Sequence, residues 1–189
     1  MNYQKQLQIR HESGIIPKTV SAHPSLIKTE VIMKKPLLYL IRSAVIGALY
    51  FVLTTVLAPI SYGVVQFRVA EALTILPFLF PEATIGLVIG CAFANISSPF
   101  GLLDIIVGAL VTGIAGFITS KIKNIWLAPL PPILLNAIFL PIVWGIVGTE
   151  QLYIINFLSL IASQAVVTYV LGVPFCKALK RFFPTKKAF

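Results

Sequence analysis

Residues 37–57 read LLYLIRSAVIGALYFVLTTVL and contain a single charged residue, Arg42. A helix needs about 20 apolar residues to cross the hydrocarbon core of a bilayer, and this stretch is long enough. Hydrophobic residues make up 58% of the whole chain and charged residues 11%, whereas a typical soluble domain has about 25% charged residues. The chain is therefore expected to be an integral membrane protein.

Five further apolar segments follow the first and are separated by short polar or proline-containing breaks. They are residues 69–80, 83–96, 102–120, 127–147 and 152–179. The first two of these are short, and short segments bounded by proline and glycine are tolerated in membranes where they line a cavity. We therefore predict an all-α integral membrane protein with a bundle of six transmembrane helices.

The basic residues concentrate before Ser43 and after Cys176, so they flank the apolar body. Basic residues are enriched in cytoplasmic segments. With six spans, this rule places both termini and the loop with Lys121 and Lys123 in the cytoplasm. Nucleic acid binding, which a net charge of +9 would otherwise allow, is the poorer interpretation of such flanks.

Three regions follow from the same pattern. Residues 1–35 form a polar, basic leader that we expect to be disordered and that lacks the apolar core of a signal peptide. Residues 36–183 form the membrane domain, and 184–189 form a basic tail. Met33, followed by two lysines and an apolar run, is a candidate translation start. The alternative is that the leader is a regulatory tail.

Several function classes are disfavoured. Both histidines, His11 and His23, lie in the leader, and Cys91 and Cys176 lie in apolar runs without metal-ligand spacing. The sequence has no Walker A, GxSxG or HExxH motif. We expect no enzyme, no cofactor and no metal site, and any ATP hydrolysis would come from a partner.

The few ionisable residues inside the apolar body are candidates for ligand binding, because charges at membrane depth are costly unless they are paired or line a cavity. Glu71, Asn95 and Asp104 are predicted near the outer ends of their helices. Two structural alternatives exist. Arg68 and Glu71, three residues apart, are spaced to form an ion pair on one helix, and Asp104 is positioned to cap the helix that begins near Leu103.

Two helices nearer the C-terminus add polar groups. Asn136 lies within an apolar run, and Trp144 follows eight residues later on the side predicted to be nearer the outside. An amide with an indole above it can bind a planar polar heterocycle; the alternatives are an interhelical hydrogen bond and an interfacial anchor. A polar stripe in the last helix is either pocket wall or packing; it comprises Asn156, Ser159, Ser163 and Gln164.

These residues occur in stretches that resemble the QueT family. The stretches are residues 65–74 (VQFRVAEALT), 76–78 (LPF), 86–91, 94–95, 101–105 (GLLDI) and 126–132 (WLAPLPP), with Asn136 behind them. The resemblance covers roughly residues 37–175 and leaves the leader unmatched. It implies the substrate-binding S component of an energy-coupling factor (ECF) transporter, which captures a queuosine precursor, a deazaguanine base, from outside.

The resemblance also implies partners and residue roles. The partners are a transmembrane coupling subunit and two ATPases, together with the lipid bilayer. An AxxxA-type face on the first helix, here Ala44 and Ala48, would dock the coupling subunit, and residues 58–67 would gate the site. The candidate substrate-binding residues are Glu71, Asn95, Asp104, Asn136, Arg68, Gln66 and Trp144.

Three other functions remain open at this stage. The chain is an S component for a different vitamin or nucleobase, a stand-alone channel or facilitator, or a structural membrane protein whose polar residues only join helices. An S component for another ligand would be stabilised by that ligand and not by a deazaguanine. A channel or facilitator would transport without ATPases. A structural protein would show no saturable ligand binding.

Overall fold

The structure is a computed structural model that describes residues 24–61, 67–148 and 152–183. The chain divides into two compact units, Met1–Leu38 and Tyr39–Phe189. The described part of the first unit is the beginning of helix α2 (Pro24–Val56). Residues 1–23 of the predicted leader and all of the predicted tail, 184–189, lie outside the described residues.

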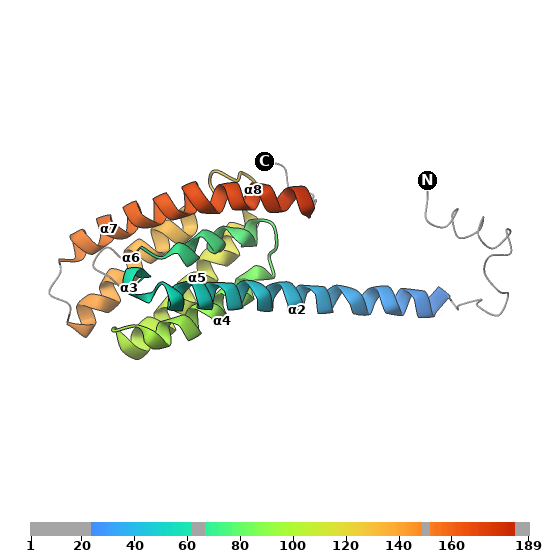
Figure 1. Ribbon diagram of the computed structural model, residues 1–189, viewed down its shortest axis with the longest axis horizontal. Helices are drawn as coiled ribbons and strands as arrows, with labels where there is room; N and C mark the ends of the chain where they lie inside the picture. The colour runs from blue at the N-terminus through green and yellow to red at the C-terminus, as the bar shows by residue number, and fades with distance from the viewer. Residues whose placement is uncertain (1–23, 62–66, 149–151, 184–189) are drawn as a thin grey trace. The chain divides into compact units, whose positions relative to one another are not determined.

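All elements in the described ranges are helices, which confirms the all-α prediction (Figure 1). After α2 the elements are α3 (Ala58–Ser61), the 3₁₀ helix η1 (Val69–Phe78), α4 (Ala83–Ala94), the 3₁₀ turn η2 (Asn95–Ser97), α5 (Gly101–Lys121), α6 (Leu130–Val147), α7 (Tyr153–Val166), the π-helical segment η3 (Val167–Gly172) and α8 (Val173–Phe182).

Four helices are long and apolar enough to span a membrane: Pro36–Val56, Gly101–Lys121, Leu130–Val147 and Tyr153–Phe182. Two shorter apolar helices, Val69–Phe78 and Ala83–Ser97, occupy the positions predicted for the two short segments. The helices thus lie where the six apolar segments were predicted. The number of membrane crossings and the cytoplasmic orientation of the termini stay predictions.

The 3₁₀ helix η1 forms the centre of the second unit. It contacts α4, α5, α8 and η3, and every residue from Ala70 to Phe78 is buried. A 3₁₀ helix of ten residues is unusual, because its hydrogen-bond geometry is poorer than that of an α-helix and most such runs are short. Pro77 lies within η1 and cannot donate a backbone hydrogen bond.

The π-helical segment η3 packs on η1 in the last long helix. At the contact, a Cβ atom on Gly172 would lie 2.9 Å from the backbone oxygen of Ala72. A glycine therefore lets the two irregular helices approach closely. π-Helical turns inside α-helices are rare and occur frequently near functional sites.

Helices α2 and α4 cross in direct backbone contact. A Cβ atom on Gly47 would lie 2.5 Å from the backbone oxygen of Gly86, and Cβ atoms on Gly86 and Gly90 would collide with the backbone oxygens of Ser43 and Gly47. Small residues allow such approach between helices in lipid, where close packing replaces the hydrophobic effect as the driving force. Gly86 and Gly90 therefore permit the close packing of α4 on α2.

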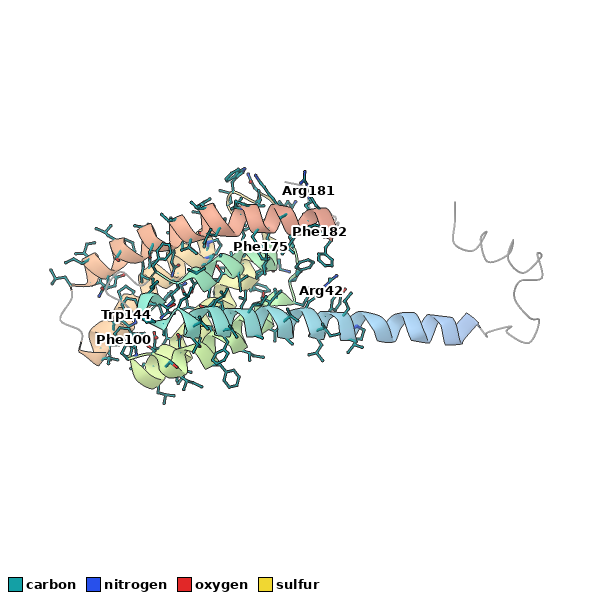
Figure 2. The ribbon with its side chains drawn as sticks, in the orientation of Figure 1. Arg42, Phe100, Trp144, Phe175, Arg181 and Phe182 are labelled. Atoms are coloured by element: carbon teal, nitrogen blue, oxygen red, sulfur yellow. The ribbon has the colours of Figure 1, made fainter. Side chains whose placement is uncertain are left out.

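One end of the unit is held by a cation–aromatic cluster. Arg42 Nη1 lies 3.4 Å from Glu82 Oε1, and its guanidinium lies over the rings of Phe80 and Phe183 at 4.8 and 5.5 Å. The cluster joins α2, the turn before α4 and the end of α8. Figure 2 shows Arg42, Arg181 and Phe182 at this end, and Phe100 and Trp144 at the opposite end.

Substitution of Gly86 by alanine should destabilise the bundle. The new Cβ has no room beside the Ser43 carbonyl, so α2 and α4 must separate, at a cost of about 1–3 kcal/mol for overpacking. The measurement is the thermal unfolding midpoint in detergent.

Gly145→Ala is the matched control, because Gly145 is also helical and a Cβ there would meet no atom within 4 Å. It should leave the midpoint unchanged or raise it slightly, since alanine favours helix. Equal midpoints for the two variants would contradict the described crossing.

Candidate functional site

Buried polar side chains gather between the helices of the second unit. They come from segments between α2 and α7, and their exposed fractions are at most 5%. The set is Tyr50, Arg68, Glu71, Asn95, Asp104, Asn136, Trp144 and Gln164. Ionisable groups this deep in an apolar bundle require partners, and the contacts fall into two clusters, one around each carboxylate.

The first cluster surrounds Asp104, near the start of α5. The Ser98 hydroxyl donates to Asp104 Oδ2 at 2.6 Å, and the Trp144 indole N–H donates to Oδ1 at 3.3 Å. Arg68 Nη2 lies 3.8 Å from Oδ2 in an ion pair whose two side chains are 3% and 0% exposed. Two side chains distant in sequence, Arg68 and Trp144, therefore converge with the nearby Ser98 on one carboxylate.

Asn95 binds both members of this ion pair. Its side-chain oxygen accepts from Arg68 Nη1 at 3.4 Å, and its side-chain nitrogen donates to the backbone oxygen of Asp104 at 3.0 Å. Arg68 Nε also donates to the backbone oxygen of Ser61 at 3.4 Å. The Ser61 hydroxyl itself is buried and has no hydrogen-bond partner among the described residues.

The second cluster surrounds Glu71, on the first turn of η1. The Tyr50 hydroxyl donates to Glu71 Oε1 at 2.8 Å, and Asn136 Nδ2 donates to Oε2 at 3.4 Å. The same Asn136 nitrogen donates to Gln164 Oε1 at 3.2 Å. This cluster joins α2, η1, α6 and α7.

The start of η1 connects the two clusters. Arg68 is the residue before the helix, and the Glu71 backbone N–H donates to the Arg68 backbone oxygen at 3.1 Å. One short turn thus carries the cation of the first cluster and the carboxylate of the second. Arg68 comes directly before η1, and Glu71 lies in the first buried turn of η1.

An aromatic pair lies beside the Asp104 cluster. The rings of Phe100 and Trp144 are stacked with centroids 5.0 Å apart and an angle of 25° between planes. Figure 2 shows the two side chains next to each other at one end of the unit. Buried carboxylates, three carboxamides and flat aromatic surfaces together can bind a planar solute that carries N–H donors.

The structure brings together six of the predicted site residues. Arg68, Asn95, Asp104 and Trp144 lie in one cluster, and Glu71 and Asn136 lie in the other. Gln66 lies outside the described residues. Asn136 and Trp144, predicted as one binding face, contact different carboxylates.

The structure bears on the two structural alternatives in different ways. Arg68 forms an ion pair with Asp104, on a distant helix, and its predicted pair with Glu71 stays a prediction. Asp104 does not act as the cap of α5: that helix begins at Gly101, its cap residue is Phe100, and the Asp104 carboxylate contacts other helices.

Sequence reasoning missed Tyr50 and Ser98. Tyr50 is one of several aromatic residues in the apolar segments. Its hydroxyl, in a segment with few polar atoms, was the only sign that it could bind a polar partner. Ser98 lies in the polar break between the predicted segments 83–96 and 102–120, where a serine is ordinary. Gln164 was recognised in the polar stripe, and its contact with Asn136 shows that it lies against the Glu71 cluster.

No metal centre is evident in the ranges that the structure describes, where no group of three or more His, Cys, Asp and Glu side chains is placed to hold an ion. Cys91, which is buried, accepts a hydrogen bond from the Thr112 hydroxyl at 3.4 Å. The Cys91 sulfur also accepts a hydrogen bond from Asn95 Nδ2 at 3.6 Å.

The predicted docking residues lie away from these clusters. Ala44 and Ala48 are exposed on α2 and line an apolar groove of about 470 Å³ between α2 and α4. Ile85, Ile89 and Phe93 of α4 form its other wall. The neighbouring face of α2, with Ser43 and Gly47, packs directly against α4.

Comparison with known proteins gives a family match. Residues 40–181 match the family model described as QueT transporter. A curated relative, the queuosine precursor transporter QueT of Lactococcus lactis subsp. cremoris, is 42% identical over 83 residues, which cover 42% of this chain and 48% of that relative. The match thus spans about half of the relative's length. No solved structure matches significantly.

The buried ion pair predicts non-additive losses of stability. Arg68→Met or Asp104→Asn alone leaves an uncompensated buried charge, which typically costs about 3–5 kcal/mol. The double variant removes both charges and should cost clearly less than the sum of the two. A double-mutant cycle on thermal unfolding in detergent measures the difference.

The pair Arg42 and Glu82 provides the control cycle, because its side chains are 26% and 17% exposed. Arg42→Met with Glu82→Gln should show a smaller coupling, as expected for a partly exposed pair. Additive effects at Arg68 and Asp104 would show that the two side chains do not interact.

Proposed function

This chain belongs to the QueT transporter family, and from that premise we propose that it is the substrate-capturing membrane subunit of an importer for a queuosine precursor. Its family and its four apolar helices make it a multi-pass protein of the cell membrane. In the proposal it is the S component of an ECF-type transporter and catalyses no chemical reaction.

The observation that supports substrate capture is the pair of buried carboxylate clusters. A deazaguanine base has a flat ring, and its polar edge presents adjacent N–H donors and a carbonyl acceptor. Carboxylates bind adjacent N–H groups in two-point contacts, and carboxamides can match the remaining donor and acceptor. Glu71 and Asp104 are the proposed carboxylates, and Asn95 and Asn136 the proposed amides.

The partners of these carboxylates support the same assignment. Glu71 accepts from a hydroxyl and an amide, and Asp104 accepts from a hydroxyl and an indole N–H. Ligand N–H groups are chemically equivalent to these donors and can replace them without leaving a buried oxygen unsatisfied. Arg68 would orient the Asp104 carboxylate through their ion pair, and Trp144 would offer a ring face to the base.

Energy for import would come from other subunits. The sequence contains no nucleotide-binding motif, and we propose a transmembrane coupling subunit and two ATPases as partners. The exposed Ala44 and Ala48 in the α2/α4 groove are the proposed contact with the coupling subunit, because small residues let a partner helix approach closely. ATP-driven movement of the partners would tilt the subunit and release the base inside.

Ligand binding should raise the stability of the purified chain. A ligand that binds only the native state stabilises it in proportion to the logarithm of its concentration over its dissociation constant. We expect saturable stabilisation by a deazaguanine base, measured by thermal shift and calorimetry, against a panel of aminomethyl and nitrile deazaguanines, guanine and several vitamins. Glu71→Gln should weaken binding about tenfold or more, because one of the two carboxylate oxygens becomes an amide nitrogen that cannot accept a ligand N–H.

Glu82→Gln is the control for this substitution, because Glu82 is paired with Arg42 at the other end of the unit. Its affinity should equal that of the parent. Unchanged affinity in Glu71→Gln would remove Glu71 from the site. A clear response to a vitamin, with none to any deazaguanine, would retain the S-component role and reject the substrate.

Enlarging the docking face should separate binding from import. Ala44→Leu with Ala48→Leu would fill the groove, so copurification with the coupling subunit and uptake in cells should fall strongly while ligand affinity stays unchanged. Ala162→Leu, an exposed alanine on α7, is the matched control and should preserve both. Full uptake by the double variant would reject this docking face, and uptake by the purified chain alone in vesicles would favour a facilitator.

A further inference from the structure

We propose that Phe100 and Trp144 form a two-sided aromatic clamp, in which the planar ring of the ligand inserts between the two side chains while Asp104 binds its N–H edge. This inference rests on the proposed function, because it requires a flat heterocyclic ligand. It adds Phe100 to the proposed site as a specificity-determining residue. It also predicts that residues 98–101 move when the clamp opens.

The two rings already have the arrangement of a closed clamp. They are nearly parallel, at 25°, with centroids 5.0 Å apart. Stacked aromatic pairs prefer such offset geometry, and a base inserted between them would keep a stacked contact on both of its faces. Opening requires the rings to separate by about the thickness of one aromatic ring.

Trp144 is the fixed side of the clamp. It is 2% exposed and packs with Ala137, Leu140, Val143 and Leu160. Its indole N–H donates to Asp104 Oδ1 at 3.3 Å, which fixes the ring plane relative to the carboxylate. A ring stacked on Trp144 therefore lies next to the Asp104 oxygens.

Phe100 is the movable side. It is half-buried and lies in the short connection between η2 and α5. The next residue, Gly101, has a φ of +69° and a Cβ there would meet no atom within 4 Å. A residue with this conformational freedom, in open surroundings, allows the connection to swing outward without collision.

The connection is held in place through the carboxylate itself. The Phe100 backbone N–H donates to the Ser98 hydroxyl at 3.2 Å, and that hydroxyl donates to Asp104 Oδ2 at 2.6 Å. A ligand N–H that binds Oδ2 competes with Ser98 for the same oxygen. Binding at the carboxylate thus loosens the segment that carries Phe100, which couples recognition of the edge to opening of the clamp.

A second stacked pair in the chain lacks this arrangement. Tyr153 and Phe157 have centroids 6.0 Å apart at 20°, and the Tyr153 hydroxyl donates to the backbone oxygen of Ile138. Both residues lie on one helix, α7, so their separation cannot change in the way a loop permits. This pair offers an internal control.

The test uses tryptophan fluorescence of the full chain. The sequence has two tryptophans, so Trp126→Phe leaves Trp144 as the sole reporter. Titration with a deazaguanine base should quench Trp144 saturably, with the same dissociation constant that calorimetry gives. In this background Phe100→Leu should weaken binding roughly tenfold, because one stacking face is lost, while Phe157→Leu should bind like its parent.

The outcomes separate the clamp from the proposed function. Saturable binding by calorimetry with unchanged Trp144 emission and full affinity in Phe100→Leu would overturn the clamp and leave the function intact. Absence of binding to every deazaguanine by a folded chain would overturn both. Phe100→Tyr, which keeps an aromatic ring, should restore affinity; a loss equal to that of Phe100→Leu would also overturn the clamp.

Discussion

A buried guanidinium is the most demanding group in this bundle, because a bilayer supplies no water to replace a lost partner. Arg68 is satisfied by Asp104, Asn95 and the backbone of Ser61. Those partners fix where α5, the end of α4 and α3 meet. The arrangement that satisfies one charge therefore also determines which helix ends converge, and the polar site is a consequence of that convergence.

The irregular helices lie against the same polar clusters. Arg68 precedes η1 with an extended backbone, whereas Glu71 lies in the first turn of η1, and the two side chains contact different clusters. The π-helical segment accommodates η1 at Gly172. Contacts with neighbouring helices compensate for the poorer backbone geometry of η1, because η1 is buried from Ala70 to Phe78.

Hydropathy alone predicted the all-helical class, the positions of the apolar helices and the two short members among them, because lipid imposes a simple length and polarity requirement. The free-energy cost of burying a charge in lipid identified Arg68, Glu71 and Asp104 as candidate site residues. It did not predict their partners, since periodicity describes one helix at a time and the ion pair joins two. Tyr50 was missed for a related reason: an amphipathic side chain in an apolar helix is indistinguishable from a core aromatic until its hydroxyl has a partner.

The glycine contact between α2 and α4 has a consequence for how such chains can diverge. Gly47, Gly86 and Gly90 each face backbone atoms of the opposing helix, so no single one of them can gain a side chain unless the helices move apart. Ala44 and Ala48 lie on the adjoining face of the same helix. Any lineage that altered the crossing would also displace that face, so internal packing and partner choice are expected to evolve as one linked trait.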